Sequence, residues 1–201
     1  MLTKRIASFV GATLLFSLPA CSSQRLDEAT ELTPAPESQE VVNQEKEPEP
    51  IWRGKNFTIT ETAVLLFLQQ QGITDKAALS TILGNIKQES KFDTKICEGG
   101  HRTGYDRCRR GGFGLIQWTT AGRYRGLGRF AKSNGLNPDS LEAQLGWMVN
   151  EREWRKIEYV WKTPGKSIDG YMWAAKKWLG WGIHGSRTSY AHTYYSQLYL
   201  A

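Results

Sequence analysis

Glu89 is the residue of this sequence whose surroundings most favour acid chemistry. Thr74, just before Asp75, is a plausible N-cap for a helix whose apolar residues recur on one face: Ala78, Leu79, Ile82, Leu83 and Ile86. Glu89 follows Ile86 by three residues, so its carboxyl group lies on the extension of that apolar stripe. Partial burial and the negative end of the helix dipole both raise its pKa. An acid still protonated near neutral pH can protonate a leaving group. The alternative is a frayed helix end whose glutamate points into water.

A glycine-rich segment lies further along the chain. Gly111, Gly112 and Gly114 flank Phe113 and lead into the sequence LIQWT. Glycines let the backbone turn sharply and approach a ligand closely, and the Gln117 amide offers both donors and an acceptor. This segment is therefore a candidate binding turn.

The segments QES at 88–90 and GLIQWT at 114–119, in this order, resemble the phage tail lysozyme family and, more distantly, goose-type lysozymes and lytic transglycosylases. Those families have a helix that ends in Glu-Ser and a later Gly-Leu-Met-Gln, and here Ile116 replaces the methionine. The resemblance extends from about Thr58 to the C-terminus. It implies a mostly α, lysozyme-like domain with a substrate cleft, without a cofactor.

The resemblance also implies an activity and a set of roles. The expected reaction is cleavage of the glycan strands of peptidoglycan between N-acetylmuramic acid and N-acetylglucosamine. Glu89 would be the catalytic acid and Ser90 would support it, while Gly114 to Gln117 would line the cleft.

The second catalytic group depends on the type of reaction. A glycosidase normally needs a second carboxylate, whereas a lytic transglycosylase lets a hydroxyl of the sugar attack. Asp106 is the candidate, because its loop could face Glu89 across the cleft; an ion pair with Arg107 or Arg109 is the alternative. We expect a hydrolase of the muramidase type. A lytic transglycosylase and a non-catalytic wall-binding lipoprotein are the alternatives.

Residues 1–20 have the pattern of a secretory signal peptide. Two basic residues precede an apolar run that is short for a membrane-spanning helix. The sequence LPAC at 18–21 resembles a bacterial lipobox, which implies that Cys21 is lipidated and anchors the protein in a membrane. An ordinary signal with an incidental cysteine is the alternative. We expect the cell envelope, and with Ser22 after the cysteine an outer membrane facing the periplasm if the host has two membranes.

The composition changes at residue 51. Residues 21–50 contain eight acidic residues, four prolines and no aromatic residue, so we expect a disordered linker. Residues 51–201 have an ordinary size for one domain and contain all eight tryptophans. Only four of the 26 basic residues precede residue 51, so this domain has a net charge of +10. The excess favours an anionic envelope polymer over nucleic acid as the partner, although it could serve solubility alone.

Two cysteines remain if Cys21 carries a lipid. Cys97 and Cys108 are then the only pair in an oxidising compartment, which predicts a disulfide that closes the intervening loop. Their spacing does not fit paired zinc ligands, so we expect no metal.

The remaining chain is predicted to be nearly all helical. Helices are expected over Glu61–Gln71, from a Thr120 cap to Lys132, and over Ser140–Arg155, Ser167–Leu179 and Thr188–Tyr199. The only β structure expected is a short ribbon inside or beside the disulfide loop.

Aromatic residues crowd the last third, and most of them should be core: Tyr171, Trp173, Trp178, Trp181, Tyr190, Tyr194, Tyr195 and Tyr199. Trp118 and Trp181 have glycine neighbours, and we predict that they stack on sugar rings.

Overall fold

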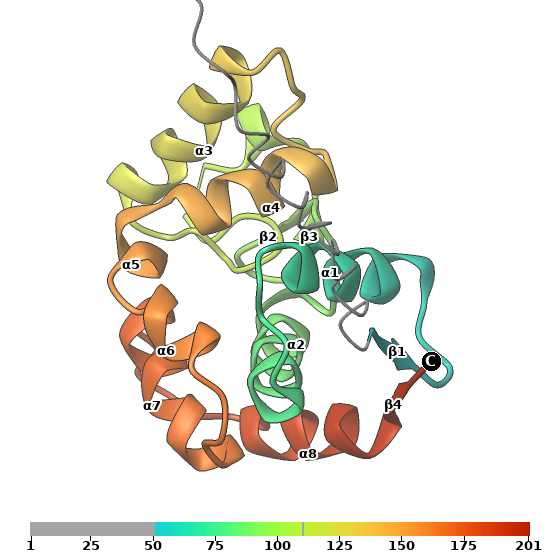
Figure 1. The fold of residues 1–201 in the computed structure, drawn as a ribbon. Coiled ribbons are helices and arrows are strands. Elements are labelled where there is room, and N and C mark those ends of the chain that lie inside the picture. Colours follow the sequence, from blue (N-terminus) through green and yellow to red (C-terminus); the bar gives the residue numbers. More distant parts are fainter. Residues whose placement is uncertain (1–50, 110) are drawn as a thin grey trace, which may run out of the picture. The chain divides into compact units, whose positions relative to one another are not determined.

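The computed structural model describes residues 51–109 and 111–201, so the predicted signal peptide, Cys21 and the linker lie outside the described residues. The described part is mostly helical, as predicted (Figure 1). Its α-helices are α1 (Ile59–Gln70), α2 (Lys76–Ser90), α3 (Ala121–Ser133), α4 (Leu141–Asn150), α5 (Arg152–Arg155), α6 (Glu158–Lys162), α7 (Ile168–Leu179) and α8 (Arg187–Gln197). A 3₁₀ helix, η1, covers Tyr105–Arg107. Within the described ranges, none of the helices has the length and apolarity needed to span a bilayer.

Helix α2 lies in the middle of the domain (Figure 1). Its N-cap is Asp75, one residue after the predicted Thr74, because the Asp75 carboxylate accepts a hydrogen bond from Ala78 N at 2.9 Å. All five residues of the predicted apolar stripe are fully buried. Buried polar residues on the other faces, Ser80, Thr81 and Asn85, show that α2 is surrounded by protein along most of its length. Its C-terminal end is therefore held on several sides.

Helix α8 packs against α2 more extensively than any other helix does, and Gly84 makes this possible. A Cβ atom at position 84 would lie only 2.5 Å from Ala191 N and 3.0 Å from Arg187 O. The two backbones therefore touch. This contact places the first residue of α8 close to the last turn of α2.

Replacing Gly84 by alanine is expected to destabilise the domain by about 1–3 kcal/mol, because the added methyl group would push α8 away from α2. Urea unfolding measures this change. Gly122→Ala on α3 is the matched control, since a Cβ atom there would meet nothing within 4 Å. Equal stability of the two variants would show that the helices do not make this contact.

The predicted helix Ser140–Arg155 is interrupted at Glu151. Ser140 is the N-cap of α4, with its hydroxyl accepting from Ala143 N at 3.1 Å. Glu151 then adopts an extended conformation, with φ −71° and ψ 154°, and α5 begins at the next residue. The break turns the Glu151 side chain into the protein interior, where it is 1% exposed. The short helix α6 was not predicted.

Two antiparallel strand pairs flank the helices. Strands β2 (Ile96–Cys97) and β3 (His101–Arg102) form the predicted ribbon at the disulfide loop. Strands β1 (Trp52–Gly54) and β4 (Leu198–Leu200) form a second pair, so the prediction of a single ribbon is wrong. For the same reason α8 ends at Gln197 rather than Tyr199, because its last residues pair with the beginning of the domain.

The aromatic residues of the last third are divided between core and surface. Tyr171, Trp178 and Tyr194 are buried, as predicted. Others are exposed, which contradicts the expectation that most are core: Trp173, Tyr195 and Tyr199. The buried rings belong to a larger aromatic cluster in which Trp154 packs edge-on against Trp178, with ring centres 4.9 Å apart.

Candidate functional site

Glu89 lies in the last turn of α2, and only 15% of its side-chain surface is exposed. Nη2 of Arg187, the first residue of α8, donates a hydrogen bond to Glu89 Oε1 at 2.6 Å. Burial raises the pKa of Glu89, and the positive charges of Arg187 and Arg123 lower it by less, so the pKa lies above its usual value. The predicted direction of the pKa shift is confirmed. The helix continues to Ser90, so the alternative of a frayed end is excluded.

The three residues of the QES segment each hold a different part of the chain. Gln88 Oε1 accepts a hydrogen bond from Ser186 N at 2.9 Å and so holds the start of α8. Glu89 pairs with Arg187, and Ser90 donates to Leu115 O at 2.7 Å in the glycine-rich turn. Ser90 is buried, so its hydroxyl supports the end of α2 from inside the protein.

The glycine-rich turn is closed and anchored through its backbone. Phe113 and Trp118 exchange two backbone hydrogen bonds across the turn. Leu115 is held on both sides, because its N–H donates to Gln144 Oε1 at 2.7 Å while its carbonyl accepts from Ser90. Gly114 has φ +70°, and a Cβ atom there would lie 2.5 Å from Gln144 Oε1. The glycine is therefore required for packing against the fully buried Gln144, to which no motif in the sequence points.

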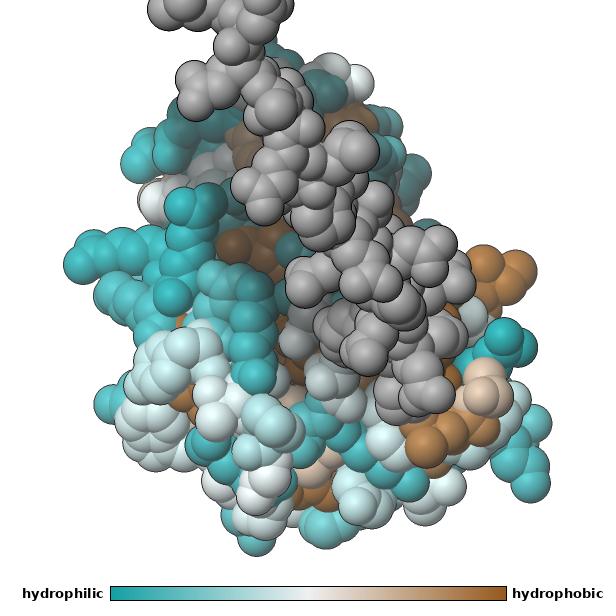
Figure 2. Space-filling model, viewed as in Figure 1, coloured by the Kyte–Doolittle hydropathy of each residue, from teal (hydrophilic) through white to brown (hydrophobic). Residues whose placement is uncertain are grey.

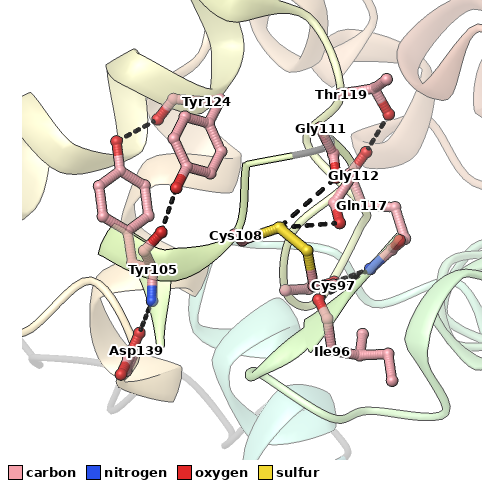
Figure 3. Close-up of a disulfide and its surroundings, with 11 residues drawn as sticks. Ile96, Cys97, Tyr105, Cys108, Gly111, Gly112, Gln117, Thr119, Tyr124 and Asp139 are labelled. Atoms are coloured by element: carbon pink, nitrogen blue, oxygen red, sulfur yellow. Dashed lines mark hydrogen bonds between the residues drawn. A yellow bond between two sulfur atoms is a disulfide. The ribbon is translucent and has the colours of Figure 1, made fainter. Parts of the chain in front are cut away.

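Gln117 combines an unusual backbone conformation with a fixed side chain. Its φ is +52°, in the left-handed region that residues other than glycine rarely adopt. Its amide donates to Ile96 O and Gly114 O, both at 3.2 Å, which ties the turn to β2 (Figure 3). Backbone strain of this kind persists where the surroundings impose it, and it is frequent at functional sites.

The predicted disulfide between Cys97 and Cys108 is present (Figure 3). Cys97 lies in β2, which pairs with β3. Cys97 also forms an antiparallel bridge with Phe113 in the glycine-rich turn. Gly114 N donates to Ile96 O at 2.9 Å, and Glu98 N donates to Gly112 O at 2.8 Å. The disulfide thus fixes the ribbon against which the turn packs.

Asp106 lies on η1 inside the disulfide loop, and its side chain is exposed. Of the described residues, neither Arg107 nor Arg109 forms an ion pair with it. The charges that shift the pKa of Glu89 belong to two arginines, not to Asp106. A catalytic role for Asp106 stays a prediction.

The two tryptophans predicted to stack on sugars have different surroundings. Trp118 is fully buried, and its indole N–H donates to Glu151 Oε2 at 3.2 Å, so the prediction that it stacks on a sugar ring is wrong. The turn directs this ring into the hydrophobic core. Trp181 is half-buried and lies against the partner of the acid, with the Arg187 guanidinium 4.6 Å from its ring centre. Its contact with substrate stays a prediction.

Glu151 and Arg123 form a buried network next to this site. Glu151 accepts hydrogen bonds from the indole N–H groups of Trp118 and Trp178, at 3.2 and 3.0 Å. Arg123 donates to both Glu151 oxygens, at 2.8 and 2.6 Å. One carboxylate therefore joins the glycine-rich turn, α3 and α7. No feature of the sequence pointed to this network, since a single glutamate in a helical pattern is usually solvated.

In the described ranges, no group of His, Cys, Asp and Glu residues could hold a metal ion.

Comparison with known proteins places the chain in a family. The model of the phage tail lysozyme family matches residues 60–198. Morphogenesis protein 1 of Bacillus phage B103 is 33% identical over 102 residues, which is 49% of this chain and 26% of that relative. The matched stretch thus spans about a quarter of the relative's length. No solved structure matches the chain. Since the family match covers more than half of the sequence and includes both the QES helix end and the glycine-rich turn, this chain belongs to the phage tail lysozyme family.

Proposed function

We propose that this domain hydrolyses the glycan strands of peptidoglycan between N-acetylmuramic acid and N-acetylglucosamine, with Glu89 as the general acid. Membership of a lysozyme family supports peptidoglycan as the substrate. The observation that carries the assignment to Glu89 is its largely buried carboxyl group with a raised pKa at the end of α2. A raised pKa favours the protonated form, and a protonated carboxyl group can deliver its proton to the glycosidic oxygen.

The glycine-rich turn supplies the proposed wall of the cleft. Ser90, the residue after the acid, donates a hydrogen bond to this turn, so the end of α2 and the turn keep fixed positions relative to each other. In this proposal, Gly114 and Gln117 present backbone and amide groups to the sugar chain, and Trp181 offers a ring face. The rigid anchoring of the turn supports a role in positioning, because a bound sugar must be held close to the acid for efficient proton transfer.

Hydrolysis requires a group that activates water, and Asp106 is our candidate for this role. A lytic transglycosylase reaction is the second candidate, and one observation favours it. Among the described residues, the charged group in contact with the Glu89 carboxyl group is Arg187, and not a second carboxylate. In that reaction a hydroxyl of the muramic acid attacks instead of water, and the product is lighter by one water.

A zymogram with purified peptidoglycan tests the proposed function. We expect the purified domain to clear the substrate. A non-catalytic wall-binding protein would bind the same material without clearing it, and this result would contradict the proposal.

Charge supports an anionic polymer as the partner. Figure 2 shows hydrophilic side chains gathered over α5 and the adjoining part of the surface. Three exposed basic residues line a hollow there together with Asn150: Arg152, Arg155 and Lys156. Peptidoglycan and associated anionic wall polymers fit a surface of this sign.

We propose further that Cys21 carries a lipid that anchors the protein in a membrane of the cell envelope. The support is the lipobox-like LPAC sequence. Cys21→Ser is expected to move the protein out of the membrane fraction or leave it with its signal attached, because serine offers no thiol for lipidation. Metabolic labelling with a fatty acid analogue measures this, and equal labelling of the wild type and the variant would contradict lipidation at Cys21.

A further inference from the structure

The Arg187 guanidinium is buried with only part of its hydrogen-bonding capacity used. Its side chain is 6% exposed, and Nη2 donates to Glu89. Nε and Nη1 are buried and have no hydrogen-bond partner among the described residues. A guanidinium group has five N–H donors, and taking it out of water is expensive unless they are satisfied. The position at the start of α8 adds an unfavourable interaction with the positive end of the helix dipole.

The surrounding residues nevertheless hold Arg187 firmly. Trp181 stacks against its guanidinium, and Gln88 binds the backbone N–H of Ser186 just before it. Gly84 lets α8 approach α2 until the Arg187 carbonyl is near the α2 backbone. Three separate contacts thus direct the Arg187 side chain towards Glu89, although burial of its guanidinium is energetically unfavourable.

We propose that Arg187 is the positioning residue of the acid. It holds Glu89 by one oxygen, Oε1, so that Oε2 carries the proton towards the glycosidic oxygen. When the C1–O bond breaks, its electron pair stays on the departing sugar oxygen, which takes the proton, and Arg187 stabilises the carboxylate left on Glu89. This inference rests on the proposed function, and water or a sugar hydroxyl completes the reaction at C1.

The electrostatics of the site separate Arg187 from the other nearby cation. Among the described residues, the charges that act on Glu89 are those of Arg187 on α8 and Arg123 on α3. Arg123 is already paired with both oxygens of Glu151, so its charge is largely compensated. Arg187 has no second carboxylate among the described residues. If water does not enter the site, loss of the Arg187 charge should therefore raise the pKa of Glu89.

The test compares Arg187→Met, which keeps apolar bulk but removes the charge, with Arg187→Lys, which keeps the charge. Two readouts are used: the pH profile of peptidoglycan cleavage, and ¹³C NMR titration of the Glu89 carboxyl group in the folded protein. In Arg187→Met, we expect the alkaline limb and the Glu89 titration to move up by about one pH unit or more, with kcat falling more than KM changes. Arg187→Lys should keep both near their wild-type positions. Arg53→Met, at an exposed arginine on β1, is the control and should change neither.

Three outcomes would overturn parts of this account in distinguishable ways. An unchanged Glu89 titration in Arg187→Met would overturn the proposed role of Arg187 in positioning Glu89. A shift as large in Arg187→Lys as in Arg187→Met would show that charge is not responsible, and this comparison holds even if one variant is less stable. An inactive wild-type protein whose Glu89 titrates as expected would overturn the proposed function and the catalytic part of the inference, but not the ion pair.

Discussion

Replacing Glu89 by glutamine is expected to reduce peptidoglycan cleavage by about 10²–10⁴-fold while the domain stays folded. The amide has the same size as the carboxylate, and its oxygen can still accept the hydrogen bond from Arg187 Nη2. It cannot, however, supply a proton to the leaving sugar. The expected loss is therefore in kcat rather than in binding.

Turbidity loss of a peptidoglycan suspension measures this effect, with circular dichroism as the check on folding. Glu142→Gln is the matched control, because Glu142 is an exposed glutamate in the first turn of α4. We expect the control to retain wild-type activity. Wild-type clearing by Glu89→Gln would remove Glu89 from the mechanism.

Replacing Glu151 by leucine is expected to destabilise the domain by about 3–5 kcal/mol. The change leaves Arg123, whose side chain is only 14% exposed, without its carboxylate partner. It also removes the acceptor from the indole N–H groups of Trp118 and Trp178. Domains of this size are usually stable by about 5–15 kcal/mol, so a large part of the total would be lost.

A double-mutant cycle with chemical denaturation separates the charge effect from packing. Arg123→Met combined with Glu151→Leu removes both charges. The double variant should therefore be more stable than the sum of the two single effects predicts. Additive effects in the double variant would show that the ion pair does not carry the stability.

Local patterns in the sequence predicted the central helix and the disulfide. The apolar stripe of α2 has a 3.6-residue repeat, and burial along one face follows from that repeat alone. The raised pKa of Glu89 then follows from its place on the stripe. The disulfide between Cys97 and Cys108 followed from the number of cysteines and from the expectation of an oxidising compartment. The N-cap was predicted one residue early, because Thr74 and Asp75 both have suitable side chains and only the fold selects between them.

Features that depend on distant parts of the chain could not be predicted in this way. Arg187 meets Glu89 across 98 residues, and no spacing rule links the two. The break at Glu151 results from a carboxylate that turns inward to reach Trp118 and Arg123, which lie on other elements. Strands β1 and β4 pair the two ends of the domain. Each strand is too short to show a recognisable strand pattern in the sequence. The glycine neighbours of Trp118 suggest an open turn, but whether this ring faces solvent or the core depends on the elements that pack on the turn, and it is buried.

The most direct test of the central claim is mass spectrometry of the soluble fragments released from purified peptidoglycan by the wild type and by Glu89→Gln. We expect disaccharide-peptides that end in reducing N-acetylmuramic acid from the wild type, and none above background from the variant. Fragments ending in the lighter anhydro sugar would identify a lytic transglycosylase that uses the same acid. Fragments cut only in the peptide stems, or equal release by both proteins, would contradict Glu89-dependent cleavage of the glycan strand.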